Sequence, residues 1–123
     1  MRPTLALVSC LFSAILAFDA RAQVSNTRSL GGHYKLDNPK VNVHAWIAPL
    51  WGTPCYAGAV TVNGALNPGE SMAICPEAGK KNTYRWANNK GGSGTIEQDA
   101  NGDLTVTVTG GPNAGKKSRW KRQ

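Results

Sequence analysis

Two histidines are the residues of this sequence that suggest acid/base chemistry. His33 follows a Gly-Gly pair, and His44 lies on the polar side of an alternating segment. Because imidazole titrates near neutral pH, a histidine pair beside a lysine could move protons to and from the ribose oxygens of RNA. A small ribonuclease-like hydrolase is therefore one hypothesis. Its alternative is that each histidine is an ordinary surface residue of a strand.

Other catalytic patterns find little support. No Ser lies in a Gly-x-Ser-x-Gly frame, and no Cys-x-x-Cys or clustered histidines could complete a zinc site. The segment 110–116 has the spacing of a phosphate-binding loop, but Lys117 stands where Ser or Thr must hold magnesium, so we interpret it as a turn between strands. The acidic residues lie in or beside turns, with no sign that two converge: Glu70, Glu77, Glu97, Asp99 and Asp103. We predict no catalytic residue, metal or cofactor, and a non-enzymatic protein is favoured.

Four tryptophans are many for a chain of 123 residues. Trp51 lies in a loop with a proline on each side, which favours a rigidly displayed indole that stacks on a sugar or base or anchors a protein contact. Trp86 is predicted to be a core residue. Trp46 is expected on the outward side of its strand, and the alternative is a core position.

The C-terminal end carries a local basic cluster. In an extended segment Lys117, Arg119 and Lys121 share one side, whereas Ser118 and Trp120 share the other and could pack on a sheet. Five cations and no acid lie in the last eight residues: Lys116, Lys117, Arg119, Lys121 and Arg122. Without residues 1–22 the net charge is +6, so the rest of the chain is only about +1.

These features lead to a binding hypothesis. We expect a small exported, non-enzymatic binding protein that uses Trp51, Lys117, Arg119, Trp120 and Lys121 to recognise an anionic polymer or a glycan-bearing surface. One alternative is a secreted inhibitor or effector of a protein partner, and the other is the ribonuclease-like hydrolase. A solubilising role for the basic end remains the simplest reading of that segment alone.

The N-terminal segment has the order of a secretory signal. An apolar run from residue 5 to 18 precedes Ala20-Arg21-Ala22, so residues 1–22 are predicted to be a cleaved signal peptide. The run is shorter than the roughly 20 residues that a membrane-spanning helix needs. A secreted or periplasmic location follows, and in that oxidising setting Cys55 and Cys75 are predicted to form a disulfide.

The elements expected to carry these residues are strands. Apolar residues alternate with polar ones from Val41 to Ile47 and from Leu104 to Val108, with shorter candidates at 56–62, 71–75, 83–87 and 94–98. Asn-Gly and Pro-Gly turns separate them. We therefore predict an all-β fold, a small antiparallel sandwich or barrel of six to seven short strands, with an irregular lead-in at 23–40 and a single domain at 41–123.

Overall fold

A computed structural model describes residues 29–67 and 71–123. Within these ranges there are nine strands, and no helix of the length and apolarity that crossing a membrane requires. The strands are β1 (Gly32–Leu36), β2 (Val43–Pro49), β3 (Tyr56–Val62), β4 (Ala65–Leu66), β5 (Met72–Pro76), β6 (Thr83–Asn88), β7 (Ser93–Gln98), β8 (Leu104–Gly110) and β9 (Lys117–Arg122).

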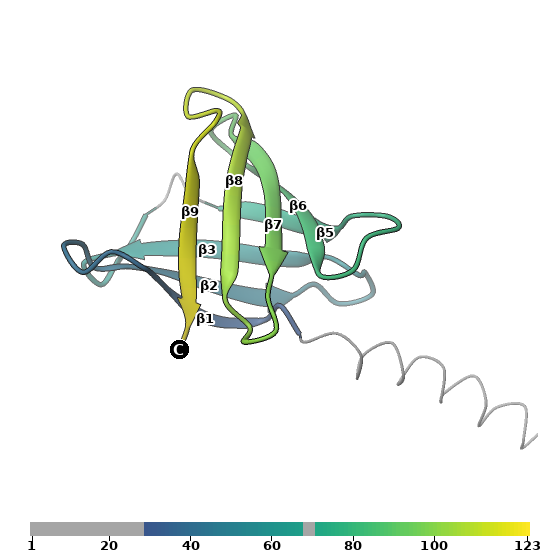
Figure 1. Cartoon of the computed structure of the whole chain (residues 1–123), viewed down its shortest axis with the longest axis horizontal. Helices are drawn as coiled ribbons and strands as arrows, with labels where there is room; N and C mark the ends of the chain where they lie inside the picture. The colour runs from purple at the N-terminus through teal and green to yellow at the C-terminus, as the bar shows by residue number, and fades with distance from the viewer. Residues whose placement is uncertain (1–28, 68–70) are drawn as a thin grey trace, which may run out of the picture.

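Eight of the nine strands close into an antiparallel barrel. Each barrel strand pairs with the next one along the chain, and β1 pairs with both β2 and β9, so the sheet returns on itself. The short strand β4 pairs only with the end of β3. In Figure 1, β7, β8 and β9 run down the front of the barrel and β1, β2 and β3 cross behind them. Closure leaves the eight strands without a free edge and creates an interior.

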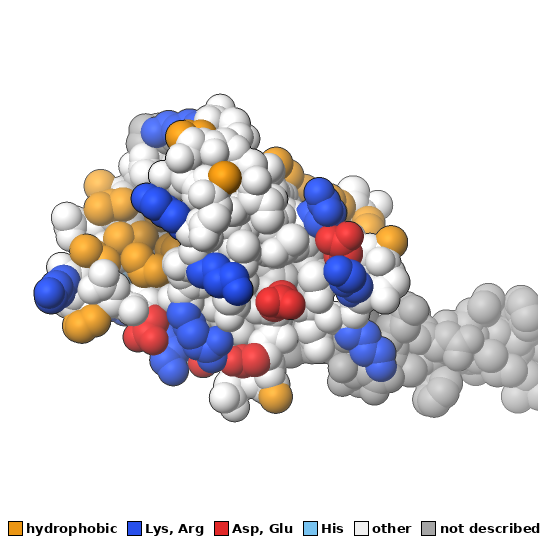
Figure 2. All heavy atoms as spheres, turned by 45° about the horizontal axis from the view of Figure 1, so that its top comes forward, with side chains coloured by type: hydrophobic (Ala, Val, Ile, Leu, Met, Phe, Trp, Pro, Cys, Tyr) orange, Lys and Arg blue, Asp and Glu red, His pale blue; other side chains and the backbone are white. Residues whose placement is uncertain are grey.

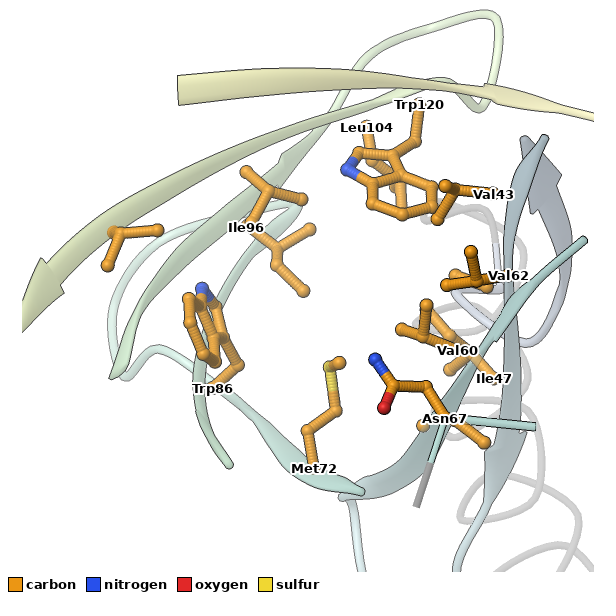
Figure 3. Close-up of a pocket in the computed structure, with 15 residues that line it drawn as sticks. Val43, Ile47, Val60, Val62, Asn67, Met72, Trp86, Ile96, Leu104 and Trp120 are labelled. Carbon is orange, nitrogen blue, oxygen red and sulfur yellow. The ribbon is translucent and has the colours of Figure 1, made fainter. Parts of the chain in front are cut away.

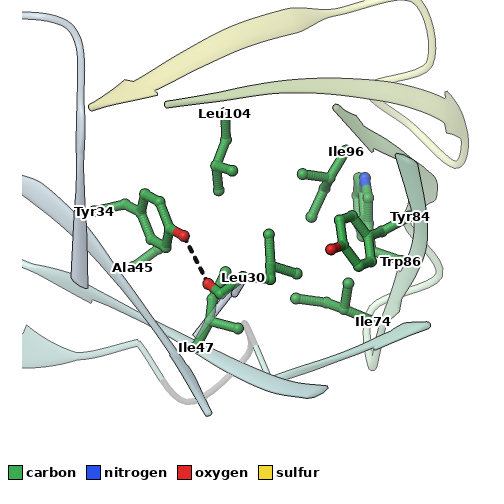
Figure 4. Packing of buried hydrophobic residues seen from close by; sticks show 9 residues of the cluster. All are labelled: Leu30, Tyr34, Ala45, Ile47, Ile74, Tyr84, Trp86, Ile96 and Leu104. Atoms are coloured by element: carbon green, nitrogen blue, oxygen red, sulfur yellow. Dashed lines mark hydrogen bonds between the residues drawn. The ribbon is translucent and has the colours of Figure 1, made fainter. Parts of the chain in front are cut away.

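Period-two alternation assigns the two faces of each strand. On β2, Ala45 and Ile47 are buried inside the barrel while Trp46 between them is exposed. The inward side chains form one apolar cluster, which Figure 4 shows from close by. Its members are Leu30, Tyr34, Ala45, Ile47, Ile74, Tyr84, Trp86, Ile96 and Leu104. The core therefore lies within the barrel, as the alternating strands predict.

The structure extends the predicted strand set. The predicted all-β antiparallel class is confirmed, and of the two predicted architectures the structure is a barrel. The predicted count of six to seven strands is too low. One added strand, β1, lies within the segment 23–40 for which an irregular lead-in is predicted. It forms because Tyr34 supplies a buried inward residue and both edges of β1 find partners. The predicted signal peptide at 1–22 lies outside the described residues.

Two local features fix neighbouring strands, a disulfide and a close strand contact at a glycine. Cys55 and Cys75 form the predicted disulfide, with Cα atoms 4.2 Å apart, at the adjoining ends of β3 and β5. The pairing of β7 with β8 shifts register between Ser93 and Gly94. A Cβ atom at Gly94 would overlap the backbone oxygen of Thr107, so only glycine lets β8 approach this closely.

Candidate functional site

The barrel interior contains a cavity of about 280 Å³ that is open at one end. Most of its lining is aliphatic and comes from the inward positions of β2, β3 and β8. Met72, Trp86, Ile96 and Trp120 complete the wall from the other strands, and Figure 3 shows these side chains around a common space. Among the lining residues Asn67 alone has an amide side chain, and Figure 3 shows that amide directed into the space.

Small inward residues leave this volume unfilled. Gly58 lies on the inner face of β3, where a Cβ atom would come within 2.8 Å of Cγ of Met72. Ala45 occupies the neighbouring inward position on β2, in register with Val60. Larger side chains at these two positions would occupy part of the cavity. The sequence pattern assigns both residues to the inside but carries no measure of the space that they leave.

The other end of the barrel is closed by packed and hydrogen-bonded residues. Leu30, Tyr34, Ile74 and Leu104 are fully buried there, and the hydroxyl of Tyr34 donates to the backbone oxygen of Leu30 at 2.6 Å. This hydrogen bond is drawn in Figure 4. The chain entering β1 is thereby held across the end of the barrel.

A polar cluster of Tyr34, Gln98 and Arg122 strengthens the closed end. The guanidinium of Arg122 donates to the hydroxyl of Tyr34 at 2.7 Å and to the backbone oxygens of Ser29 at 3.1 Å and Gly31 at 2.8 Å. Nε2 of Gln98 also donates to the Ser29 oxygen, at 3.3 Å. Arg122 is therefore a half-buried cation that holds residues 29–31, which lead into β1.

The predicted binding residues are distributed over both faces of the barrel. Trp120 is inside and lines the cavity, as the two-sided pattern of the C-terminal segment suggests. Trp51 is outside, at the β2–β3 connection, with 99% of its surface exposed. Lys117, Arg119 and Lys121 lie on the outer face of β9. The structure therefore does not combine Trp51, Trp120 and the cations into one surface.

Acidic side chains accompany the C-terminal cations. Arg119 pairs with Asp99 at 2.6 Å, and Asp103 lies 3.7 Å from Arg119 and 3.6 Å from Lys121. The hydrogen bond from Arg119 holds the pKa of Asp99 below its usual value. On the face seen in Figure 2, red acidic side chains lie among the blue basic ones. The local basic cluster of the sequence thus becomes a mixed-charge surface.

The two histidines meet on the outer face of β1 and β2. Nε2 of His33 lies 2.6 Å from Nδ1 of His44, and the His33 ring stacks on Trp46 with centroids 3.8 Å apart. The pKa of His33 is lowered mainly by desolvation and to a lesser degree by the neighbouring His44. An acid and a base acting on phosphate need the substrate between them, and here the two nitrogens contact each other directly.

Comparison of the chain with protein-family models, with curated proteins and with solved structures finds no match. The geometry of the cavity is therefore the main guide to function. None of the residues that line it has an ionisable side chain, so the lining offers apolar contact and one amide rather than a nucleophile or a proton carrier. Such an arrangement suits binding.

Proposed function

We propose that this protein is an exported carrier or sensor that binds a small apolar molecule inside the barrel. The observation that carries the proposal is the apolar cavity of about 280 Å³, open at one end and closed at the other. Ligand sites are typically concave, mostly apolar and furnished with a few polar groups. An eight-stranded barrel has the width to be filled by side chains or to hold one small ligand.

The cavity volume sets the size of the ligand. A dry apolar cavity of about 150 Å³ holds one benzene molecule. A volume of about 280 Å³ therefore suits a molecule about the size of two fused rings. Because the amide of Asn67 is directed into the space, a ligand with one hydroxyl or carbonyl group would fit better than a pure hydrocarbon.

The probe that tests the proposal is 2-naphthol, which has two fused rings and one hydroxyl group. At about −0.5 kcal/mol for each of its roughly 11 non-hydrogen atoms, the expected Kd is about 0.1 mM. Isothermal titration calorimetry should give a stoichiometry close to one. Binding should also carry a negative heat-capacity change, because apolar surface is buried.

A matched pair of variants on β8 locates the bound probe. Val106→Phe places a ring in the cavity and should weaken 2-naphthol binding at least about tenfold, whereas Thr107→Phe adds the same ring on the outer face. Thermal melts of both variants establish that they are folded. Equal binding by the wild type and Val106→Phe would contradict the proposal.

A second proposal rests on Trp51, whose 99% exposure favours contact with a glycan. An exposed indole stacks readily on a sugar ring. Trp51→Ala should then abolish retention on an immobilised glycan panel and leave 2-naphthol binding unchanged. Retention that is equal for the wild type and Trp51→Ala would remove this proposal without affecting the first.

A further inference from the structure

The histidine pair, His33 and His44, forms a compact two-nitrogen site on the outer face of the barrel. The residues are eleven positions apart in sequence, and the pairing of β1 with β2 brings Nε2 of His33 within 2.6 Å of Nδ1 of His44. Neighbouring inward residues such as Tyr34 and Ala45 face the opposite side of the same strands. The pair is therefore independent of the cavity and of the function proposed for it.

The hydrogen bonds of His44 show which of its ring nitrogens carries the proton and which carries the lone pair. Nε2 of His44 lies 2.8 Å from Oδ1 of Asn42, an acceptor, so this nitrogen carries the proton. Nδ1 of His44 then presents its lone pair to His33. Metal-binding histidines usually donate their other N–H to an oxygen in this way, which orients the ring and raises its basicity.

The ring of His33 is also held in place. It lies nearly parallel to the indole of Trp46, at an interplanar angle of 11°, and the indole N–H of Trp46 donates to the hydroxyl of Thr61 at 3.3 Å. A change of tautomer that moves the His33 proton from Nε2 to Nδ1 would free the Nε2 lone pair, so that both facing nitrogens could bind one ion after a small reorientation of the rings.

From this geometry we infer that His33 and His44 form a binding site for a divalent copper ion, with Asn42 as the residue that positions His44. Metal–nitrogen bonds of about 2.0 Å place two ligand nitrogens about 2.8–2.9 Å apart at a 90° angle and about 3.3 Å apart at a tetrahedral angle. The observed separation of 2.6 Å is close to the first value. Square-planar Cu²⁺ therefore fits with less movement than tetrahedral Zn²⁺.

The surroundings of the pair determine what completes the copper coordination. Among residues 29–67 and 71–123, no group of three or more His, Cys, Asp and Glu residues gathers as a metal cluster, so the inferred site has two imidazole ligands and water in the remaining positions. Lys35 lies opposite His44 in the strand register, but its ammonium group is directed to the backbone oxygen of Val41, 3.5 Å away. Both imidazoles are partly exposed on this face of the barrel, and the Lys35 ammonium group is engaged elsewhere.

Titration of the purified chain with Cu²⁺, supplied as its glycine complex to suppress weak binding, tests the inference. Calorimetry should give one site, and electron paramagnetic resonance should show nitrogen couplings from two imidazoles. Cu²⁺ should bind at least about tenfold more tightly than Zn²⁺. Because the chain has only two histidines, the double variant His33→Gln/His44→Gln removes every imidazole and should lose the site.

Asn42→Ala separates a built site from an incidental histidine contact. It leaves both imidazoles intact, yet loss of the oxygen that orients His44 should weaken Cu²⁺ binding about tenfold. Metal-free thermal melts establish that each variant is folded. Unchanged copper binding by the double variant, by Asn42→Ala, or equal affinity for Zn²⁺ and Cu²⁺ would overturn the inference.

Discussion

Replacement of Arg122 by methionine should destabilise the barrel far more than the same replacement of an exposed cation on the same strand. The substitution keeps the aliphatic length but removes three side-chain hydrogen bonds, to Ser29, Gly31 and Tyr34. Hydrogen bonds to a charged group contribute about 1.5–3 kcal/mol each, and solvent access at this end reduces that to about 1 kcal/mol apiece. The expected loss in the free energy of unfolding is therefore about 2–4 kcal/mol.

Thermal and urea denaturation measure this loss. For a domain of this size, each kcal/mol shifts Tm by about 4–8 °C, so Arg122→Met should melt about 10–25 °C below the wild type. Arg119→Met is the matched control, because Arg119 forms an exposed ion pair with Asp99 on the outer face. Exposed pairs contribute less than about 1 kcal/mol. Similar melting points for the two variants would refute the role assigned to the polar cluster of the closed end.

Three further outcomes are expected. Replacement of Cys55 and Cys75 by alanine should cost roughly 3 kcal/mol in the chain-entropy account, measured by urea denaturation, and a loss below about 0.5 kcal/mol would contradict it. Since Arg119 lowers the pKa of Asp99 in the folded state, its carboxylate stabilises the fold above the unfolded pKa of about 3.9 and loses that effect as the pH falls through the folded value. Asp99→Asn should then be less stable than the wild type at pH 7, with the gap closing below about pH 4; a gap independent of pH would exclude this ion pair as its source. When the wild type and the variant lacking both histidines are incubated with RNA, the rate of RNA cleavage should be the same for both. Cleavage by the wild type that is lost in the variant would restore the hydrolase hypothesis.

Alternation and turn residues are local signals, and they predicted most of the barrel wall. The alternating segment 104–108 became β8, and the glycine-rich segment after it became the turn to β9. Two cysteines, together with a predicted export signal, were enough to predict the disulfide that the structure contains. Trp86 is buried, in agreement with its predicted core position.

Closure of the sheet is a long-range property, and the features that depend on it could not be read from local patterns. The strand β1 is short and has one fully buried residue, Tyr34, so its sequence resembles a loop until both its edges are paired. The cavity depends on the space that Gly58 and its neighbours leave across the barrel. The histidine pair depends on the β1–β2 register.

Arg122 shows how a usable signal was overlooked. The same alternation that separates Trp120 from its cationic neighbours also places Arg122, two residues later, on the inner face. From the sequence, Arg122 is counted in the basic cluster by its charge and is not assigned to a face. Because β9 closes the barrel against β1, removal of the C-terminal segment would open the fold as well as remove charge.

Nuclear Overhauser effects between bound 2-naphthol and the protein show whether the ligand lies in the barrel interior. The proposal predicts contacts from the naphthol ring protons to the methyl groups of Val60, Met72 and Val106, all of which line the cavity. Contacts confined to Trp51 or to other residues of the outer face would contradict it.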